Sequence, residues 1–396
     1  MDKKLTAPTL KIGRNKLLDK LSGLLLGFPL AFPGPPFYLL AFLAFSFSLL
    51  RIKKNVALFI KLALLIVLAL ISNFVALSYG QVTLPQAIYT SVVFVFFLFG
   101  FGLRSFEQFF DGFVFVTNML SIAVLVIFVA TRQYEAGINL FISPTLRLWG
   151  DPWFPDWPNF FGSLLGIGFL LKVLLRKPWY WILISAAAIL LTTSRTPLLA
   201  ILIGLFFYGQ TIYKKRGLLM ALIFIFGSVA TILVYLNWFW LGDTIVVSDQ
   251  LQNRIFKFND RQIIWTESLR LIQSRPILGH GSVQLSTLSQ YGYSFHNSYT
   301  EILIRHGIVA FVIWVAMLFP AKILKFRSSG YLHMVLYIAL ASMFNNLLKH
   351  PYFLMFLSVW IAHAADIHVF LLSKIRQKAQ FARARQVSSN PQLTYK

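Results

Sequence analysis

The stretch VALFIKLALLIVLALISNFVAL, residues 56–77, carries a single charged side chain, Lys61, and is otherwise almost wholly apolar. An α-helix needs about 20 such residues to cross the hydrocarbon core of a bilayer, so this stretch predicts a membrane-spanning helix. Similar stretches recur along nearly the whole chain, whose 396 residues are 58% hydrophobic and only 12% charged. That balance is far more apolar than that of a soluble domain and leaves no separate soluble domain of ordinary size.

The recurring apolar stretches predict an all-α membrane protein with about twelve transmembrane helices. Their predicted ranges are 21–33, 36–50, 56–77, 85–103, 113–131, 159–171, 179–193, 197–212, 217–241, 298–321, 331–348 and 352–372. The first two are short and are separated by the proline-rich residues 32–36, so they form either two crossings or one re-entrant hairpin. Either alternative preserves the topology of the helices that follow.

The formal charge of +23 would indicate a nucleic-acid partner in a soluble chain. Here the positions of the basic residues explain it. With the N-terminus inside the cell, 25 of the 36 Lys and Arg residues lie in the termini and short loops of the cytoplasmic side, and 10 lie on the outer side. This bias predicts that both termini are cytoplasmic. We expect contact with membrane lipids and no nucleic-acid partner. The basic N-terminus resembles a signal peptide without a cleavage site, and we expect it to be retained.

This orientation divides the chain into four parts. Residues 1–241 hold transmembrane helices 1–9 and a long outer segment, 132–158. Residues 242–297 form a second outer segment, in which Asn259 and Asp260 predict the cap of an amphipathic helix that begins near Arg261 and stops before Pro276. Residues 298–373 hold helices 10–12. Residues 374–396 form a cytoplasmic tail whose composition predicts disorder.

Arg195 lies in the turn Thr193-Ser194-Arg195-Thr196-Pro197, between two apolar stretches that are shorter than a full span. The turn should therefore be recessed below the outer surface. Pro197 is favoured in a first helical turn, which places Arg195 at a helix N-terminus, where free amides favour phosphate. A recessed cation requires an anion, and the alternative is an arginine that extends to the interface.

His296 precedes a predicted helix in which Ser298 and Glu301 have capping-box spacing. That spacing explains Glu301 but not the histidine, whose pKa ordinarily lies close to neutral and suits a general base. Arg305 follows Glu301 by four residues, the spacing of a helical ion pair. The sequence leaves two interpretations of Arg305: a structural ion pair with Glu301, or a functional arginine.

Several kinds of site are missing from the sequence. The outer segments contain no Asp-x-Asp pair and no close cluster of His and carboxylates, so we expect no metal. The chain has no cysteine, which excludes disulfides and thiol catalysis. It has neither a Gly-x-Ser-x-Gly elbow nor a Gly-Lys-Ser/Thr phosphate loop, so we expect no nucleotide-driven chemistry and no cofactor.

Four motifs resemble the family of O-antigen ligases and O-antigen polymerases. His296-Asn297, followed after nine residues by Gly307, is similar to the signature of that family, although Ala310 stands where Gly, Thr or Tyr is usual. The other three are Ser194-Arg195-Thr196, Arg261–Trp265 leading into Pro276–Gly281, and Trp157–Gly162. The four occur in the order of the family over about the C-terminal two thirds of the chain.

The resemblance implies transfer of a glycan from an undecaprenyl-diphosphate carrier to an acceptor hydroxyl, at the periplasmic face of a bacterial inner membrane and without metal or nucleotide. The two arginines and the histidine that carry the reaction in the family match Arg195, Arg261 and His296. The arginines would hold the diphosphate leaving group, and His296 would accept the proton of the attacking hydroxyl. Further residues that we expect to contact the substrate are Arg147, Asn159, Asn297 and Arg305.

Within the family, we favour a ligase that transfers finished polymer to lipid A-core over a polymerase that extends a growing polysaccharide, because the four motifs and the compact length look more like a ligase. The absence of a large outward C-terminal domain argues against a protein-glycosylating relative. A flippase or transporter would place ionisable residues near the bilayer midplane. Here they gather at the outer mouth, except for His363 and Asp366, which we interpret as a structural pair.

Overall fold

The computed structural model describes residues 8–31, 35–52, 56–130, 157–191, 195–213, 259–283, 297–318, 326, 330–344 and 351–389. Within these ranges the secondary structure consists of helices and the turns between them, without a strand. The prediction of an all-helical protein is therefore confirmed for this part of the chain.

The helices agree well with the predicted spans. The N-terminal half contains α1 (Pro8–Ala31), α2 (Pro35–Leu49), α3 (Val56–Ser78), α4 (Leu84–Val92), the 3-10 helix η1 (Val93–Leu98), α5 (Phe99–Gly102), α6 (Phe106–Ala130), α8 (Trp157–Leu174) and α9 (Trp179–Leu191). These are followed by α10 (Arg195–Tyr213), α13 (Asn259–Ser274), α15 (Ser298–Leu318), α16 (Tyr331–Phe344), α17 (Pro351–Ala362) and α18 (Ala364–Ser389). The predicted span 217–241 lies outside the described residues.

Among the described helices, four stretches are long and apolar enough to cross a membrane: Ala57–Ser78, Leu84–Gly102, Phe106–Val126 and Ser298–Leu318. A fifth arises if α17 and α18, which meet at a bend of 75°, count as one span. Shorter apolar helices occur at Gly162–Leu174, Trp179–Leu190, Pro197–Phe207 and Tyr331–Met343. The chain is therefore a multi-pass membrane protein, while the number of twelve spans stays a prediction.

Both ends of the helical part differ from the expectation. Helix α1 begins at Pro8 instead of near residue 21, so the basic residues Lys11, Arg14, Lys16 and Lys20 belong to the same helix as the first apolar stretch. At the other end, α18 continues to Ser389, and the prediction of disorder from Lys374 is wrong as far as this residue. The residue types that indicated a disordered tail are Ala, Gln, Arg and Ser, and the first three of these are also strong helix formers.

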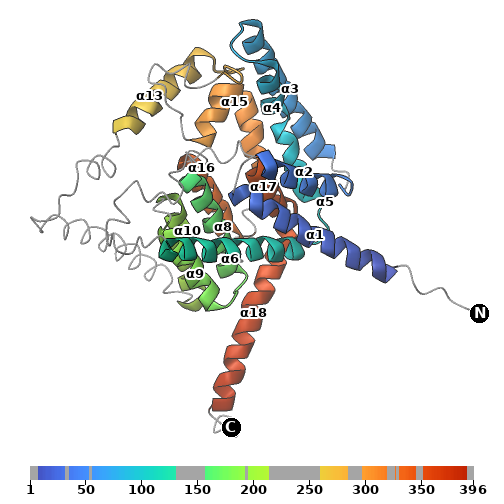
Figure 1. Cartoon of the computed structure of the whole chain (residues 1–396), viewed down its shortest axis with the longest axis vertical. Helices are drawn as coiled ribbons and strands as arrows, with labels where there is room; N and C mark the ends of the chain where they lie inside the picture. The colour runs from blue at the N-terminus through green and yellow to red at the C-terminus, as the bar shows by residue number, and fades with distance from the viewer. Residues whose placement is uncertain are drawn as a thin grey trace, which may run out of the picture.

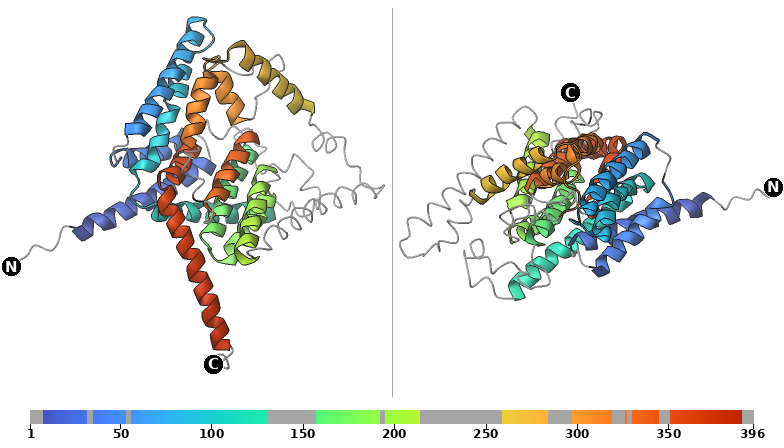
Figure 2. Two further views of the ribbon diagram at one scale, coloured as in Figure 1. Left: turned by 180° about the vertical axis from the view of Figure 1, so that it is seen from behind. Right: turned by 90° about the horizontal axis from the view of Figure 1, so that it is seen from above.

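The helices pack as a bundle in which elements distant in sequence meet. Helix α1 packs along α6, α8 packs against α6, α9 and α10, and α15 packs against both α3 and α16. Figure 1 shows α3, α13 and α15 gathered at one end of the molecule, while α18 projects from the other end toward the C-terminus; Figure 2 shows the same separation from behind. The end that carries α13 is the one that we predict to face outward.

A continuous apolar core joins these helices, and it includes the fully buried Trp314 and Trp360. Helix α17 approaches the η1–α5 segment closely, because a Cβ at Gly100 would lie 2.3 Å from the backbone of Ser358. The Gly100 N–H donates to Ser358 Oγ at 2.8 Å, and His363 Nε2 lies 3.1 Å from the Gly100 carbonyl oxygen. His363 Nδ1 lies 3.7 Å from Asp366. These contacts agree with a structural role for the pair at the bend.

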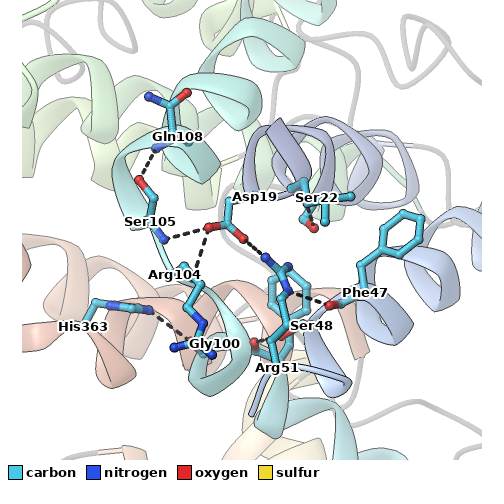
Figure 3. Close-up of polar contacts among 12 residues, drawn as sticks. Asp19, Ser22, Phe47, Ser48, Arg51, Gly100, Arg104, Ser105, Gln108 and His363 are labelled. Atoms are coloured by element: carbon cyan, nitrogen blue, oxygen red, sulfur yellow. Dashed lines mark hydrogen bonds and ion pairs between the residues drawn. The ribbon is translucent and has the colours of Figure 1, made fainter. Parts of the chain in front are cut away.

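Asp19 of α1 is a fully buried carboxylate that joins three segments (Figure 3). Its Oδ1 accepts a 2.7 Å hydrogen bond from Arg51, which follows α2. Its Oδ2 accepts the backbone N–H groups of Arg104 at 3.0 Å and Ser105 at 2.7 Å, directly before α6. Amides at a helix N-terminus have no partner within the helix, so Asp19 fixes α1 and α2 to the start of α6.

Candidate functional site

Two of the predicted catalytic residues lie in the first turns of helices. Arg195 is the first residue of α10, which confirms its predicted place at a helix N-terminus. Arg261 is the third residue of α13, the amphipathic helix predicted for this segment. Asn159 lies in the first turn of α8. The side chains of these three residues, and the whole of His296 and Arg147, lie outside what the structure describes.

The described part of the site is the junction of α13, α15 and α3. It is built around residues 275–283, which we call the 275–283 turn. The turn follows the C-terminal end of α13, where Pro276 stops the helix as predicted. Leu271 in the last turn of α13 is buried at 3% exposure, so this end of α13 packs into the protein.

Helix α15 is broken at Gly307, and the 275–283 turn fills the break. Gly307 has φ 74° and ψ −179°, values outside the helical region that favour glycine. The break frees the Ile304 and Arg305 carbonyls, which accept the N–H groups of His280 at 2.7 Å and Gly281 at 2.8 Å. In return, the Ile308 N–H donates to the Pro276 carbonyl at 2.8 Å. Three main-chain hydrogen bonds therefore fix the turn to α15.

The opposite side of the turn is bound to α3 and α4. The Ser72 hydroxyl donates to the Leu278 carbonyl, and the Ser282 hydroxyl contacts both Asn73 Oδ1 and the Thr90 hydroxyl. Asn73 Nδ2 donates to the Thr90 hydroxyl at 3.0 Å, to the Ser91 hydroxyl at 2.8 Å and to the Ala87 carbonyl at 3.1 Å. This polar seam couples the turn to the same helices that form the end of the bundle.

The start of α15, directly after His296, is also well defined. Asn297 Oδ1 accepts the backbone N–H groups of Tyr299 at 2.9 Å and Thr300 at 3.2 Å, so Asn297 caps the helix. The predicted cap at Ser298 is wrong by one residue. The Glu301 carboxylate accepts the Arg305 Nε–H at 2.9 Å, which confirms the predicted ion pair. Arg305 Nη1 also donates to the Val283 carbonyl at 3.3 Å.

Residues 180–315 match the O-antigen ligase family. The matched range begins in α9 and ends in α15, and it includes Arg195, Arg261, His296 and Arg305. The predicted resemblance to O-antigen ligases and polymerases is thus confirmed. No curated protein matches the chain. The Trp157–Gly162 motif lies before the matched range, at the start of α8.

The O-antigen ligase match includes two further arginines around α13, which differ from each other. Arg270 forms two hydrogen bonds to Glu267, at 2.6 and 2.9 Å, and these bonds hold the pKa of the Glu267 carboxyl below its usual value. The Arg275 guanidinium instead lies over the Tyr79 ring, 5.8 Å from its centre. Each of these two arginines therefore has a partner within the protein.

His280 is the residue of this junction that sequence reasoning missed. Its side chain is 7% exposed, and its Nε2 lies 3.0 Å from the Leu271 carbonyl oxygen and 3.1 Å from the Ser274 hydroxyl. Burial lowers the pKa of the imidazole, the hydrogen bond to the Leu271 carbonyl offsets part of this effect, and the positive charges of Arg275 and Arg270 lower the pKa further. The net direction favours the neutral ring near pH 7. The signal in the sequence was Gly279-His280-Gly281, a bulky polar residue between two glycines.

Among the side chains that the structure describes, no three His, Asp or Glu residues lie together as a metal site would require. The polar groups of the described junction are mainly amides, hydroxyls and arginines. Such groups bind anions and sugar hydroxyls through hydrogen bonds.

Proposed function

We propose that this protein is an O-antigen ligase-like glycosyltransferase of the bacterial inner membrane. It transfers a glycan from undecaprenyl diphosphate to a sugar hydroxyl of lipid A-core at the periplasmic face, without a metal or cofactor. The observation that carries this proposal is the O-antigen ligase match over residues 180–315, within which Arg195 and Arg261 occupy the first turns of α10 and α13.

The positions of the two arginines suit a diphosphate. The first turn of a helix presents free backbone N–H groups and the positive end of the helix dipole, both of which favour an anion. An arginine in that turn adds a charged, bidentate donor. Arg195 and Arg261 would therefore stabilise the negative charge that develops on the diphosphate as it leaves the sugar.

His296 would serve as general base. The acceptor oxygen forms a bond to the anomeric carbon while the bond from that carbon to the diphosphate oxygen breaks, and the hydroxyl proton moves to the imidazole. Direct displacement of this kind inverts the configuration at the anomeric carbon. The diphosphate keeps the electron pair of the broken bond and remains on the lipid carrier.

Four further residues would bind substrate around this centre. Arg147 and Arg305 would contribute positive charge, and Asn159 and Asn297 would contribute amide donors. Since the Oδ1 atom of Asn297 already caps α15, its side-chain NH₂ group is the part that would contact a sugar. Arg305 would act beside its ion pair with Glu301, through donors of the guanidinium other than Nε.

The proposed topology has about twelve spans, with both termini in the cytoplasm and the 275–283 turn on the periplasmic side. Two features support this orientation. The basic residues gather in the segments assigned to the inside. In addition, α13 and the basic helix α18 extend from opposite ends of the bundle.

A polymerase that uses the same centre is the alternative within the family. The two differ in the glycolipids of a deletion strain: loss of a ligase leaves long chains on the carrier, whereas loss of a polymerase leaves a core capped with one repeat unit. A flippase is a third possibility of a different class, and it would have no transfer activity to lose.

The proposal is tested with purified protein in detergent, a lipid-linked glycan donor and lipid A-core acceptor. His296→Ala, Arg195→Ala and Arg261→Ala should each lower the transfer rate by about 100-fold or more, as expected for loss of a catalytic group. Arg270→Ala removes an exposed arginine of the same helix as Arg261 and should leave the rate close to that of the parent. Parent-like transfer by His296→Ala would contradict the assignment of the base.

A further inference from the structure

Helix α13 is fixed at its C-terminal end, so a change in its tilt displaces Arg261 near its N-terminal end. Its C-terminal end lies beside α15, and its N-terminal end points away from the bundle (Figure 1). Arg261 lies ten residues before Leu271, or about 15 Å along the helix. A tilt of about 10° at the fixed end would therefore move the Arg261 backbone by about 2.6 Å. A displacement of about 1 Å can already cost an enzyme about 100-fold in rate.

His280 connects this fixed end of α13 to α15, because its ring contacts α13 and its main chain contacts α15. The His280 ring contacts the Leu271 carbonyl and the Ser274 hydroxyl, both in the last turn of α13. The His280 backbone N–H donates to the Ile304 carbonyl of α15 at 2.7 Å. The Leu271 carbonyl also accepts the Ser274 hydroxyl at 2.8 Å and the Arg275 N–H at 3.4 Å, so the His280 ring is the partner that comes from outside α13.

The backbone around His280 has little freedom to adjust. Gly279 and Gly281 both have φ near +69°, a conformation that side-chain-bearing residues rarely adopt. A Cβ at Gly279 would lie 2.5 Å from the Arg305 carbonyl, and a Cβ at Gly281 would lie 2.7 Å from the Ser72 carbonyl. The imidazole is therefore attached to a rigid turn, and any movement of α13 changes its contacts with Leu271 and Ser274.

We propose that His280 is a positioning residue that fixes the tilt of α13, and with it the distance between Arg261 and the start of α15, which His296 precedes in the sequence. This role rests on the proposed function for its catalytic consequence. Its geometric part, the tilt of α13, can be measured without any substrate. His280 itself does not touch the reacting atoms in this account.

The chain contains no cysteine, so two introduced cysteines carry the only spin labels. Thr266→Cys on the exposed face of α13 and Val312→Cys on the exposed face of α15 define a distance that changes with the tilt. The parent pair should give a narrow distance distribution. His280→Leu, which removes the ring donor, should broaden or shift it, and His280→Gln, whose amide reaches a similar place, should restore it.

Transfer kinetics add a second readout. His280→Leu should lower kcat by about tenfold with an unchanged KM for the acceptor, and His280→Gln should recover most of the rate. A distance distribution that stays narrow and unshifted in His280→Leu would overturn the proposal, whatever the rate. If His280→Leu does not fold, Ser274→Ala removes one ring contact at a more exposed site; broadening in that variant supports the role, and a parent-like distribution overturns it.

These outcomes separate the inference from the proposed function. A parent protein without glycan transfer, but with a distribution that broadens in His280→Leu and recovers in His280→Gln, would refute the enzyme and keep the positioning role. Transfer that depends on Arg261 and His296, together with an unchanged distribution in His280→Leu, would keep the enzyme and refute the role of His280.

Discussion

Arg305 donates a 2.9 Å hydrogen bond from Nε to Oε1 of Glu301, one helical turn earlier in α15, and the two side chains are only 18% and 4% exposed. The pair lies beside the break at Gly307, where the Arg305 carbonyl also accepts the Gly281 N–H. Arg305 therefore takes part in the junction with its side chain and its main chain.

Glu301→Gln should destabilise the protein strongly, because it leaves the largely buried Arg305 without its counter-charge. Loss of one partner of a buried ion pair costs about 3–5 kcal/mol. Adding Arg305→Met should restore much of the melting temperature, since the double variant no longer contains an unpaired buried charge. The double variant should nevertheless transfer glycan more slowly than the parent, because Arg305 is proposed to bind substrate. A double variant with the full rate would remove Arg305 from the binding residues.

The buried Asp19 should contribute far more to stability than the exposed Asp111. Asp19→Ala leaves Arg51 and two backbone amides without their acceptor, and we expect a loss of about 3–5 kcal/mol. Asp111 pairs with Lys177 at 2.8 Å on the surface, and Asp111→Ala should cost at most about 1 kcal/mol. Thermal unfolding in one detergent compares the two, and equal losses would contradict the role of Asp19 in joining α1, α2 and α6.

Two glycines with similar positive φ angles, Gly80 and Gly307, should respond differently to substitution. Gly80 has φ +66° and open space around it, so Gly80→Ala should cost about 1–2 kcal/mol from backbone strain alone. A Cβ at Gly307 would lie 1.9 Å from the Ile277 carbonyl oxygen. Gly307→Ala must therefore separate α15 from the 275–283 turn, with a larger loss of stability and loss of transfer. If the two alanine variants unfold at the same temperature, the break in α15 does not hold the turn.

The hydropathy pattern predicted most of the helices, because apolar runs such as residues 56–77 leave few alternatives to a helix. It failed where the chain changes direction within an apolar run. Gly307 bends α15 and His363 separates α17 from α18, yet neither position changes the hydropathy. A run of apolar residues indicates that a helix lies in an apolar environment, but it does not indicate where the helix breaks.

The site was predicted in part from local spacing. Arg195 at a helix start and the Glu301–Arg305 pair follow from short-range rules and are found in the structure. The role of Asp19 depends on partners about 85 residues away in the sequence. The role of His280 depends on the break in α15, whose freed carbonyl it binds. Such contacts arise from packing, so a single sequence gave no pattern for them.

Acid should weaken the parent protein more than His280→Gln. The buried imidazole has a lowered pKa in the folded protein, whereas an unfolded histidine titrates at about 6.5. As the pH falls through about 6.5, the unfolded chain binds more protons than the folded protein, so the stability of the fold decreases toward the lowered pKa of the buried ring. The difference between the parent and His280→Gln isolates the contribution of the ring. An identical acid-induced drop in melting temperature for both proteins would show that His280 is not buried as a neutral ring.

The account as a whole depends on Arg195, Arg261 and His296 meeting at one centre that opens to the periplasm. The most direct measurement uses the cysteine-free chain with two double variants, Arg195→Cys with His296→Cys and Arg261→Cys with His296→Cys. A short bis-maleimide that does not cross membranes is added to the periplasmic side of spheroplasts. Lys177→Cys with Asp111→Cys, whose native side chains lie 2.8 Å apart at the predicted cytoplasmic end, serves as the control.

We predict internal cross-links in both site pairs from the periplasmic side, and a cross-link in the control pair only after the membrane is opened. Site pairs that react with single maleimides but never cross-link, or that react only when the cytoplasmic face is exposed, would contradict the proposed catalytic centre.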